Sequence, residues 1–262
     1  MATARPFPII KPTSRSYSPG TYPSTDFESL DGTKTHIRYG NKRVNATLSL
    51  GFSNISDQKA AEILIDIGAV SISVEKPFTL TSGKKSPVYV DCRKIISFPK
   101  ERKKLMKMAL QILQNRASFD VIAGGETAGI PFAAWISELT SLPMIYIRKK
   151  SKGFGKNKRI EGDFKPSSNI LLVEDLATDG GSKMSFVNAI RDAGGQCNTC
   201  FVIFHYNIFK QEIDKLKAQN VSIIELATWK NIIDVLYSRK IPESRITSIE
   251  SFLENPNEWK PK

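Results

Sequence analysis

Four short apolar runs mark the second half of the chain, each of a length that suits one buried strand. They cover residues 121–123, 144–147, 170–173 and 201–204. The segments between them are long enough for crossover helices. Strands that alternate with helices predict an α/β fold with a doubly wound, mainly parallel sheet and helices on both faces. Such sheets bind ligands beyond the carboxyl ends of their strands, so the residues directly after these runs are the candidates for chemistry.

Two earlier segments show helical periodicity. In residues 100–115 the apolar positions recur at a helical spacing opposite a lysine-rich face, which predicts an amphipathic helix. Those apolar positions are Leu105, Met108, Ala109, Ile112 and Leu113. The other helix is expected to begin with Ser56 as its N-cap, to bury Ala60, Leu64 and Ile67, and to end at Gly68.

Residues 1–55 differ from the rest and are expected to form an N-terminal extension, partly disordered, ahead of a core domain over 56–262. Five prolines interrupt its first part, at Pro6, Pro8, Pro12, Pro19 and Pro23. Apolar residues then alternate with polar ones from Val44 to Phe52, after a Gly40-Asn41 turn signal, which predicts a β-hairpin. A targeting presequence is an alternative for the first residues, although the prolines oppose an amphipathic helix.

Composition limits the function. Lys and Arg number 38 against 26 Asp and Glu, a net charge of +12, which favours either nucleic acid or small, highly charged anions as ligands. Seven basic residues crowd the stretch from Arg148 to Arg159, so a phosphate ligand is the better interpretation. No apolar stretch approaches ~18 residues, and we expect a cytoplasmic protein without a membrane partner. Three cysteines, two of them in a single C-x-x-C, predict reduced structural thiols.

The strongest chemical signal follows the run 170–173, where Glu174 and Asp175 come at once and the segment Thr178 to Ser182 comes next. Adjacent carboxylates at a strand end can accept hydrogen bonds from a ribose cis-diol, or hold the water shell of Mg²⁺. Glycines let backbone N–H groups approach a phosphate, and a helix that starts near Ser182 adds its N-terminal dipole. The alternative is a polar turn that only caps a helix.

This segment resembles the signature of type I phosphoribosyltransferases, which use phosphoribosyl diphosphate (PRPP). The resemblance implies that Glu174 and Asp175 face the ribose hydroxyls and stabilise positive charge that develops at the anomeric carbon. It implies Mg²⁺ as cofactor, carried by PRPP and in contact with Asp175 through water. The PRPP-binding residues implied here are Glu174, Asp175, Leu176, Ala177, Thr178, Asp179, Gly180, Gly181 and Ser182.

Three further segments resemble the orotate phosphoribosyltransferase family. Residues 77–93 look like its orotate-side segment, which implies orotate contacts from Thr81, Ser82, Gly83, Lys84 and Tyr89, together with Thr178. Many members have a lysine where this chain has Thr81, and Lys84 or Lys85 could replace it in part. Without the other motifs, this segment reads as a surface hairpin with loop lysines.

The second segment, residues 124–131, resembles the family's diphosphate-binding loop and adds Thr127 and Ala128 to the PRPP set. Many relatives have lysine at the position of Ala128. The alternative is a helix-entry turn that binds no ligand.

The third segment, residues 148–162, resembles a mobile lid that closes over PRPP. It implies that Arg148, Lys149 and the catalytic Lys152 bind PRPP, with Lys152 reaching the diphosphate across a homodimer. Most relatives have a histidine at the position of Phe154. A solvated charged loop is the alternative.

The C-terminal region gives weaker support, from the likeness of residues 226–229 and 249–253 to a bacterial branch of the family. A late arginine that many relatives use is not evident, and His205-Tyr206 stands there instead. His205 is either packed at the end of its strand or catalytic.

Together these features predict Mg²⁺-dependent transfer of the phosphoribosyl group from PRPP to N1 of orotate, in pyrimidine synthesis. Two alternatives stay open: a phosphoribosyltransferase for another base, and a PRPP-sensing regulator on the same fold that binds nucleic acid. The expected partners are PRPP, orotate and a second copy of the chain, and nucleic acid is not expected.

Overall fold

The computed structural model describes residues 49–79, 83, 85–151, 159–178 and 181–260, together with the short strands at 27–28 and 34–35. For residues 49–56, 181–182 and 210–212 it describes the backbone elements alone. The chain divides into two units, Met1–Thr47 and Leu48–Lys262. In the first unit, β1 (Phe27–Glu28) pairs antiparallel with β2 (Lys34–Thr35).

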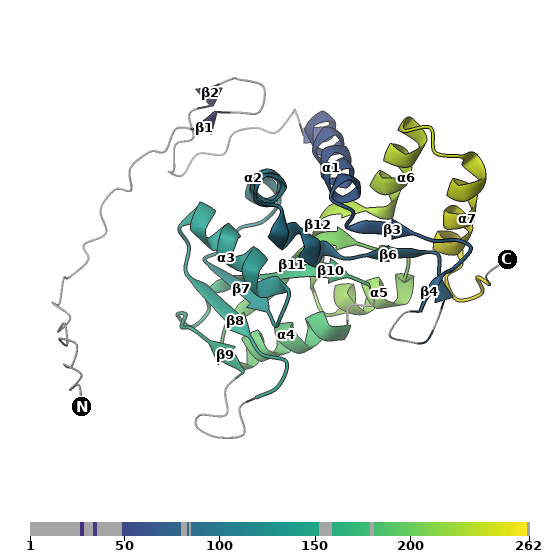
Figure 1. Ribbon diagram of the computed structural model, residues 1–262. Coiled ribbons are helices and arrows are strands. Elements are labelled where there is room, and N and C mark those ends of the chain that lie inside the picture. Colours follow the sequence, from purple (N-terminus) through teal and green to yellow (C-terminus); the bar gives the residue numbers. More distant parts are fainter. Residues whose placement is uncertain are drawn as a thin grey trace, which may run out of the picture. The chain divides into compact units, whose positions relative to one another are not determined.

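Six strands form the central sheet of the second unit, in the order β12-β11-β10-β7-β8-β9 (Figure 1). All neighbours are parallel except β9, which pairs antiparallel with β8 at one edge. The strands are β7 (Val121–Gly125), β8 (Met144–Ile147), β9 (Ile160–Glu161), β10 (Asn169–Ala177), β11 (Gln196–His205) and β12 (Ser222–Thr228). This confirms the predicted doubly wound, mainly parallel sheet, with all four apolar runs inside strands.

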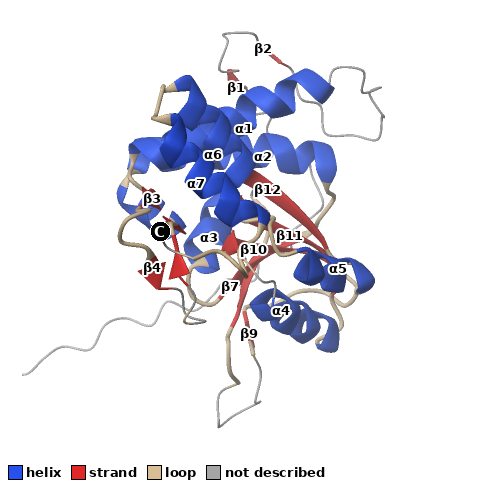
Figure 2. Ribbon diagram, turned by 90° about the vertical axis from the view of Figure 1, so that its right-hand side faces the viewer, coloured by secondary structure: helices blue, strands red, loops and turns tan. Residues whose placement is uncertain are grey.

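Helices cover both faces of the sheet (Figures 1 and 2). One face carries α4 (Gly181–Asp192) and α5 (Lys210–Ala218). The opposite layer contains α1 (Ser49–Asp66), α2 (Pro99–Arg116), α3 (Gly129–Thr140), α6 (Trp229–Ser238) and α7 (Glu243–Glu254). Because side chains alternate along a strand, β10 supplies Leu171 and Val173 to this layer and Ile170 and Leu172 to the α4 layer.

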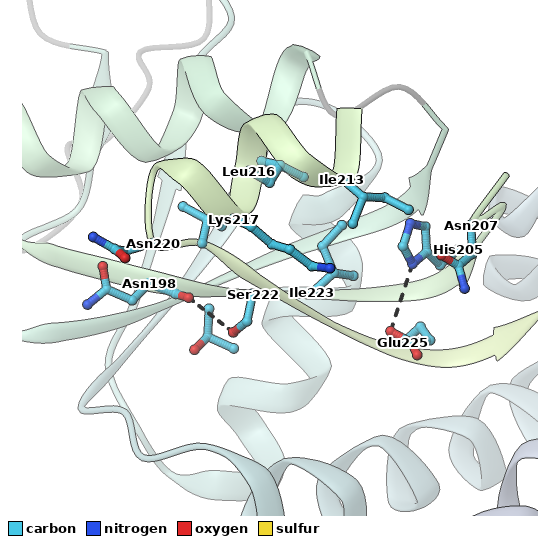
Figure 3. Close-up of a pocket in the computed structure, with 12 residues that line it drawn as sticks. Asn198, His205, Asn207, Ile213, Leu216, Lys217, Asn220, Ser222, Ile223 and Glu225 are labelled. Carbon is cyan, nitrogen blue, oxygen red and sulfur yellow. Dashed lines mark hydrogen bonds and ion pairs between the residues drawn. The ribbon is translucent and has the colours of Figure 1, made fainter. Parts of the chain in front are cut away.

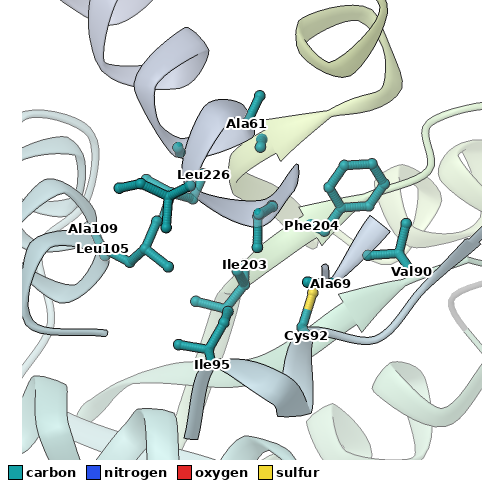
Figure 4. Close-up of a cluster of buried hydrophobic side chains, with 14 of the residues drawn as sticks. Ala61, Ala69, Val90, Cys92, Ile95, Leu105, Ala109, Ile203, Phe204 and Leu226 are labelled. Atoms are coloured by element: carbon teal, nitrogen blue, oxygen red, sulfur yellow. The ribbon is translucent and has the colours of Figure 1, made fainter. Parts of the chain in front are cut away.

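A second set of short strands lies over the larger layer. β3 (Val70–Ile72) pairs antiparallel with β6 (Val88–Val90), and β4 (Phe78–Thr79) pairs antiparallel with β5 (Lys85–Ser86). The 3₁₀ helix η1 (Cys92–Ser97) follows β6. Figure 4 shows how Val90, Cys92 and Ile95 join side chains of α1, α2 and β11 in one buried cluster. This packing anchors residues 85–97 to the sheet.

Two predictions about the start of the domain are wrong. The alternation from Val44 to Phe52 does not give a strand at its C-terminal end, because α1 begins at Ser49, and Ser56 lies inside that helix instead of capping it. Residues 44–48 lie outside the described residues, and the pair β1–β2 involves other residues than the predicted hairpin. A short apolar alternation cannot separate strand from helix, and a helix that is already forming extends cooperatively.

The helix ends where its glycine predicts. Gly68 has φ 68°, its N–H donates to Ile65 O at 2.9 Å, and the N–H of Ala69 donates to Leu64 O at 2.9 Å. A glycine with positive φ after the last turn satisfies the orphan carbonyls of a helix C-terminus. The predicted helix over residues 100–115 is likewise confirmed by α2.

An acidic cavity of about 470 Å³ lies where α1, α6 and β12 meet, and its lining includes Asp57, Glu225 and Asp234. The pKa of Asp57 is raised to about 6, mainly by burial and then by the carboxylate of Glu225, whereas Arg116 opposes the shift. The folded protein therefore binds a proton at Asp57 more tightly than the unfolded chain does.

We expect Asp57→Asn to stabilise the protein above pH 6 and to have no such effect below pH 4. An acid with a raised folded pKa loses stability as pH rises through the window between the unfolded and folded values, and the amide does not titrate. The gain, discounted for solvent screening, is about 1 kcal/mol, or roughly 2–4 °C in Tm for a domain of this size. Thermal unfolding at pH 4, 6 and 8 measures it. Asp214→Asn, at an exposed position on α5, is the control; an equal Tm shift at every pH would contradict the assignment.

Candidate active site

Two motifs that are 50 residues apart in sequence meet at the carboxyl edge of the sheet. β10 pairs with β7 in a register that sets Val173 opposite Gly124. The acid pair of Glu174 and Asp175 therefore emerges beside the turn that joins β7 to α3. This confirms that the segments at 124–131 and 174–178 lie together, as the parallel strands predict.

The alternation of β10 directs the two carboxylates to opposite faces of the sheet. Glu174 interacts electrostatically with Lys149, and it raises the pKa of Cys200, whose side chain packs in the α4 layer. Asp175 interacts with Arg93, which follows β6, and it raises the pKa of the buried thiol of Cys92. Asp175 therefore faces the segment 85–93, and Glu174 faces α4.

Glu174 is buried with 8% of its surface exposed, and its Oε1 has no hydrogen-bond partner among the described residues. A methyl group added at Gly125 or Gly129 would overlap that oxygen. These two glycines therefore make room for the carboxyl group of Glu174, in addition to keeping the turn free of side chains. The pKa of Glu174 is raised to about 7, mainly by burial; Lys183 opposes this shift, the charge of Asp175 adds to it, and Lys149 opposes it more weakly.

Asp175 is only partly buried. Burial raises the pKa of Asp175. The charge of Lys183 is the largest opposing influence, and the charge of Arg93 and backbone hydrogen bonds of Asp175 and Leu176 oppose the shift more weakly. Asp175 thus lies near two cations, Lys183 and Arg93, and remains accessible on one side, where it can bind a ligand.

Lys183 is a residue of this site that the sequence pattern does not predict. It lies in the first turn of α4, is 3% exposed, and donates from Nζ to Leu176 O at 2.7 Å. The signal was present, since Lys183 directly follows Ser182, but nothing in a sequence pattern tells a buried lysine from an exposed one. Its side chain returns from α4 to the strand that carries the acid pair.

The segment after the acid pair is described only in part. Thr178 is half-buried, α4 begins at Gly181 as the predicted helix start near Ser182 requires, and Leu176 and Ala177 end β10. Asp179 and Gly180 lie outside the described residues.

The predicted diphosphate loop forms a turn over residues 126–128, after which α3 begins at Gly129. The Glu126–Thr127 peptide bond is cis. Thr127 is exposed and Ala128 half-buried, so this turn presents its backbone and one hydroxyl to solvent. Glu126 accepts a hydrogen bond from the N–H of Lys149 at 2.6 Å, and its own N–H donates to Ile147 O at 2.9 Å. The turn is thereby tied to the start of the cationic stretch.

The two ends of the cationic stretch are held together by Arg159. Its Nε donates to Arg148 O at 2.9 Å, its carbonyl accepts from the N–H of Arg148 at 2.8 Å, and one Nη donates to Ser185 O at 3.1 Å on α4. Arg148 also lies 3.9 Å from Glu161. Lys152 and Phe154 lie outside the described residues, so what the structure places is the base of this segment.

On the orotate side, an exposed aromatic face stands next to a cation. Tyr89 is 37% exposed and contacts Phe78 with ring centroids 5.7 Å apart and ring planes tilted by 37°. Arg93 donates to Asp91 at 2.8 Å and to the hydroxyl of Tyr89 at 3.4 Å. Lys85 donates to Thr79 at 2.8 Å, and Gly83 has φ 81°. Thr81, Ser82 and Lys84 lie outside the described residues.

His205 ends β11, and Tyr206 directly follows it. His205 is 5% exposed and lies 3.9 Å from Glu225, at a cavity of about 690 Å³ under α5 (Figure 3). Tyr206 packs edge-on against Phe204 and Trp229, and burial raises its pKa. The structure thus favours the packed interpretation of His205. The three cysteines are all buried free thiols, as predicted.

A doubly wound sheet whose central strand ends in an acid pair, between a glycine loop and the start of a helix, defines a type I phosphoribosyltransferase. Comparison with similar proteins then identifies the family within this class. Orotate phosphoribosyltransferase of Cereibacter sphaeroides is 49% identical over 203 residues, which are 76% of this chain and 88% of the relative. That of Sinorhizobium medicae is 41% identical over 221 residues, 80% of this chain and 95% of the relative. The chain belongs to the orotate phosphoribosyltransferase family.

Solved structures agree with this assignment. The crystal structure of orotate phosphoribosyltransferase from Aeropyrum pernix has a TM-score of 0.58 and 26% identity, and the match covers 68% of this chain and 99% of that one. No family model matches the chain. Among the helices that the structure describes, none has the length and apolar character needed to cross a membrane.

The glycines around Glu174 give a pair of contrasting predictions. Gly129→Ala would bring a methyl group against the backbone carbonyl of Val173, which cannot move aside, so we expect a loss of about 1–3 kcal/mol in stability. At Gly125 the atoms nearest to the added methyl belong to the side chains of Glu174 and Phe186. We therefore expect Gly125→Ala to lower the Tm less than Gly129→Ala does. Gly125→Ala should lower kcat more, because it displaces the carboxyl group of Glu174.

Thermal unfolding and steady-state kinetics on both variants measure this contrast. If the two variants lost stability equally and Gly125→Ala kept full turnover, the carboxyl group of Glu174 would not depend on the glycine loop.

Proposed function

We propose that the edge where β7, β10 and α4 meet carries out the reaction of this family, the transfer of the phosphoribosyl group from PRPP to N1 of orotate. The observation that carries the proposal is the convergence of Asp175, the buried Glu174 and the turn 126–128 at one place. Chemically, this is a cluster of carboxylates beside backbone donors, which suits a sugar that bears phosphates. The product would be orotidine 5′-monophosphate.

Each part of the site has its own task. Asp175 and Glu174 bind the ribose hydroxyls, and their negative charge stabilises the oxocarbenium character that develops as diphosphate leaves. The segment 178–182, with Asp179 and Gly180, encloses the 5′-phosphate at the N-terminus of α4. Thr127 and Ala128 face the diphosphate. Orotate is already an anion, so the transfer does not need a strong general base, and catalysis comes from positioning and charge.

Orotate would lie against the exposed ring of Tyr89, on the side of the sheet that Asp175 faces. This face is flat and apolar, and the guanidinium of Arg93 next to it supplies a positive field for an anionic base. Thr81, Ser82, Gly83 and Lys84 complete the orotate side, and Thr178 reaches it from the end of β10.

Mg²⁺ fits this site as a companion of PRPP. No three His, Cys, Asp or Glu side chains gather into a metal site within the described ranges, so the protein offers single carboxylates and not a cage. Asp175 would hold the ion through water, while phosphate and hydroxyl oxygens of PRPP supply its direct ligands. When bound, the ion neutralises part of the charge of the departing diphosphate.

The cationic stretch acts as the closing part of the site, with Arg148, Lys149 and Lys152 on PRPP. Its base is fixed by Arg159, so closure involves the residues between the two ends. We further propose a homodimer in which Lys152 serves the site of the neighbouring subunit. A cytoplasmic location completes the proposal and is supported by three thiols that stay unpaired.

Asp175→Asn should lower kcat roughly 10²-fold while Tm stays within a few degrees, because it removes a charge that acts in the transition state. Turnover is followed by the absorbance of orotate with PRPP and Mg²⁺. Asp192→Asn, at an exposed position near the end of α4, is the matched control. Full activity of Asp175→Asn would refute the role of the acid pair, and wild-type turnover of a purine base without turnover of orotate would refute the proposed substrate.

Lys152→Ala should reduce kcat by a similar factor, roughly 10²-fold, because it withdraws a positive charge from the diphosphate as it departs. Lys165→Ala, at an exposed position after β9, is expected to be silent. Mixing Lys152→Ala with Asp175→Asn tests the shared site, since mixed dimers would contain one site with both intact residues. Recovery of activity on mixing supports the cross-subunit arrangement, whereas no recovery contradicts it.

A further inference from the structure

Lys183 occupies a position that a lysine should avoid. It is 3% exposed, although burial of an ammonium group is costly, and it lies in the first turn of α4, where the helix dipole disfavours a positive charge. Two unfavourable effects at one residue require a compensating interaction nearby.

Residues of β10 supply this compensation. The ammonium group donates to Leu176 O at 2.7 Å, and it is the largest opposing charge on both Glu174 and Asp175, whose pKa values burial raises. The other cations that interact with the pair are more exposed: Lys149 lies at the surface, and 57% of the side chain of Arg93 is accessible. Since water screens exposed charges, Lys183 is the dominant partner of the pair.

Lys183 also interacts with both Glu174 and Asp175. They face opposite sides of the sheet, yet both interact with this one ammonium group, which is bound to the carbonyl of the next residue, Leu176. The same side chain therefore joins three things: the acid pair, the backbone that leads to Thr178, and the start of α4. Because its Nζ is buried and directed at the protein, it is not placed to contact a substrate.

We propose that Lys183 is a positioning residue that neutralises part of the charge of the acid pair and locks the end of β10 to α4, so that anionic PRPP can bind. This rests on the proposed PRPP site. Without Lys183, two carboxylates with reduced compensation would repel the diphosphate, and the strand end would lose a tether. Orotate, whose proposed contacts lie mainly in the segment 81–89, would be affected less.

The test compares Lys183→Met, Glu174→Gln and the double variant with the wild type. Lys183→Met should weaken PRPP binding by at least roughly tenfold, because it leaves buried charge unpaired, while the KM for orotate changes by less than about twofold. The double variant removes the ammonium group together with the carboxylate whose burial it opposes, so it should recover part of the Tm and part of the PRPP affinity. Calorimetric titration with PRPP, steady-state kinetics and thermal unfolding are the measurements.

Lys230→Met is the matched control, because Lys230 also lies in the first turn of a helix, α6, but its side chain is 82% exposed. Additive effects of Lys183→Met and Glu174→Gln on both Tm and PRPP affinity would overturn the proposal, as would wild-type affinity of Lys183→Met. If Lys183→Met does not fold, the double variant decides: folding of the double variant supports charge compensation, and its failure to fold contradicts it. A wild type that binds no PRPP refutes the proposed function, whereas the coupling in Tm still reports on Lys183.

Discussion

The burial of a carboxyl group at the end of a central strand is the constraint around which this site is organised. Glu174 is 8% exposed. Burial of its carboxyl group requires neighbours without side chains on one side and a cation on another. Gly125 and Gly129 meet the first demand, since no side chain fits there, and Lys183 meets the second. Loop 124–131 and the first turn of α4 are thus shaped by one acid that belongs to neither.

The doubly wound sheet explains why these parts can meet with such accuracy. Parallel strands β7 and β10 are held in register over four residue pairs, from Ile170 opposite Val121 to Val173 opposite Gly124. Both faces of the sheet are packed, so neither strand end can shift without disturbing a core layer. Catalysis by positioning needs such a rigid base, and the segments expected to move are left to the loops beyond it.

Much of this could be predicted from the sequence, because it depends on local pattern. Apolar runs of strand length, the acids after residues 170–173 and the lysine-rich face of residues 100–115 are all local, and each is found where it was predicted. The predictions that failed depended on long-range contacts or on an ambiguous pattern. The alternation near Leu50 fits a strand as well as a helix, and β12 stayed unassigned because its apolar run is broken by Glu225.

The site shows the same division between local and distant information. The sequence brings Glu174 and Asp175 to notice as a pair, yet only the pleat of β10 shows that they diverge. Lys183 was overlooked because its importance comes from burial, which depends on how α4 packs on the sheet. The role of Gly125 and Gly129 as neighbours of Glu174 depends on a register between strands 50 residues apart.

The clamp made by Arg159 has a consequence for how this protein can vary. Since the N–H of Arg148 donates to the carbonyl of Arg159, and the guanidinium returns the bond to Arg148 O, the scaffold itself brings the ends of the intervening chain together. Interactions at the sheet edge therefore offset the entropic cost of closing this loop. A doubling of the loop length would add only about 0.6 kcal/mol to that cost. A change in the length of the chain between Arg148 and Arg159 therefore costs the fold little, because the bonds that fix the two ends do not depend on that length.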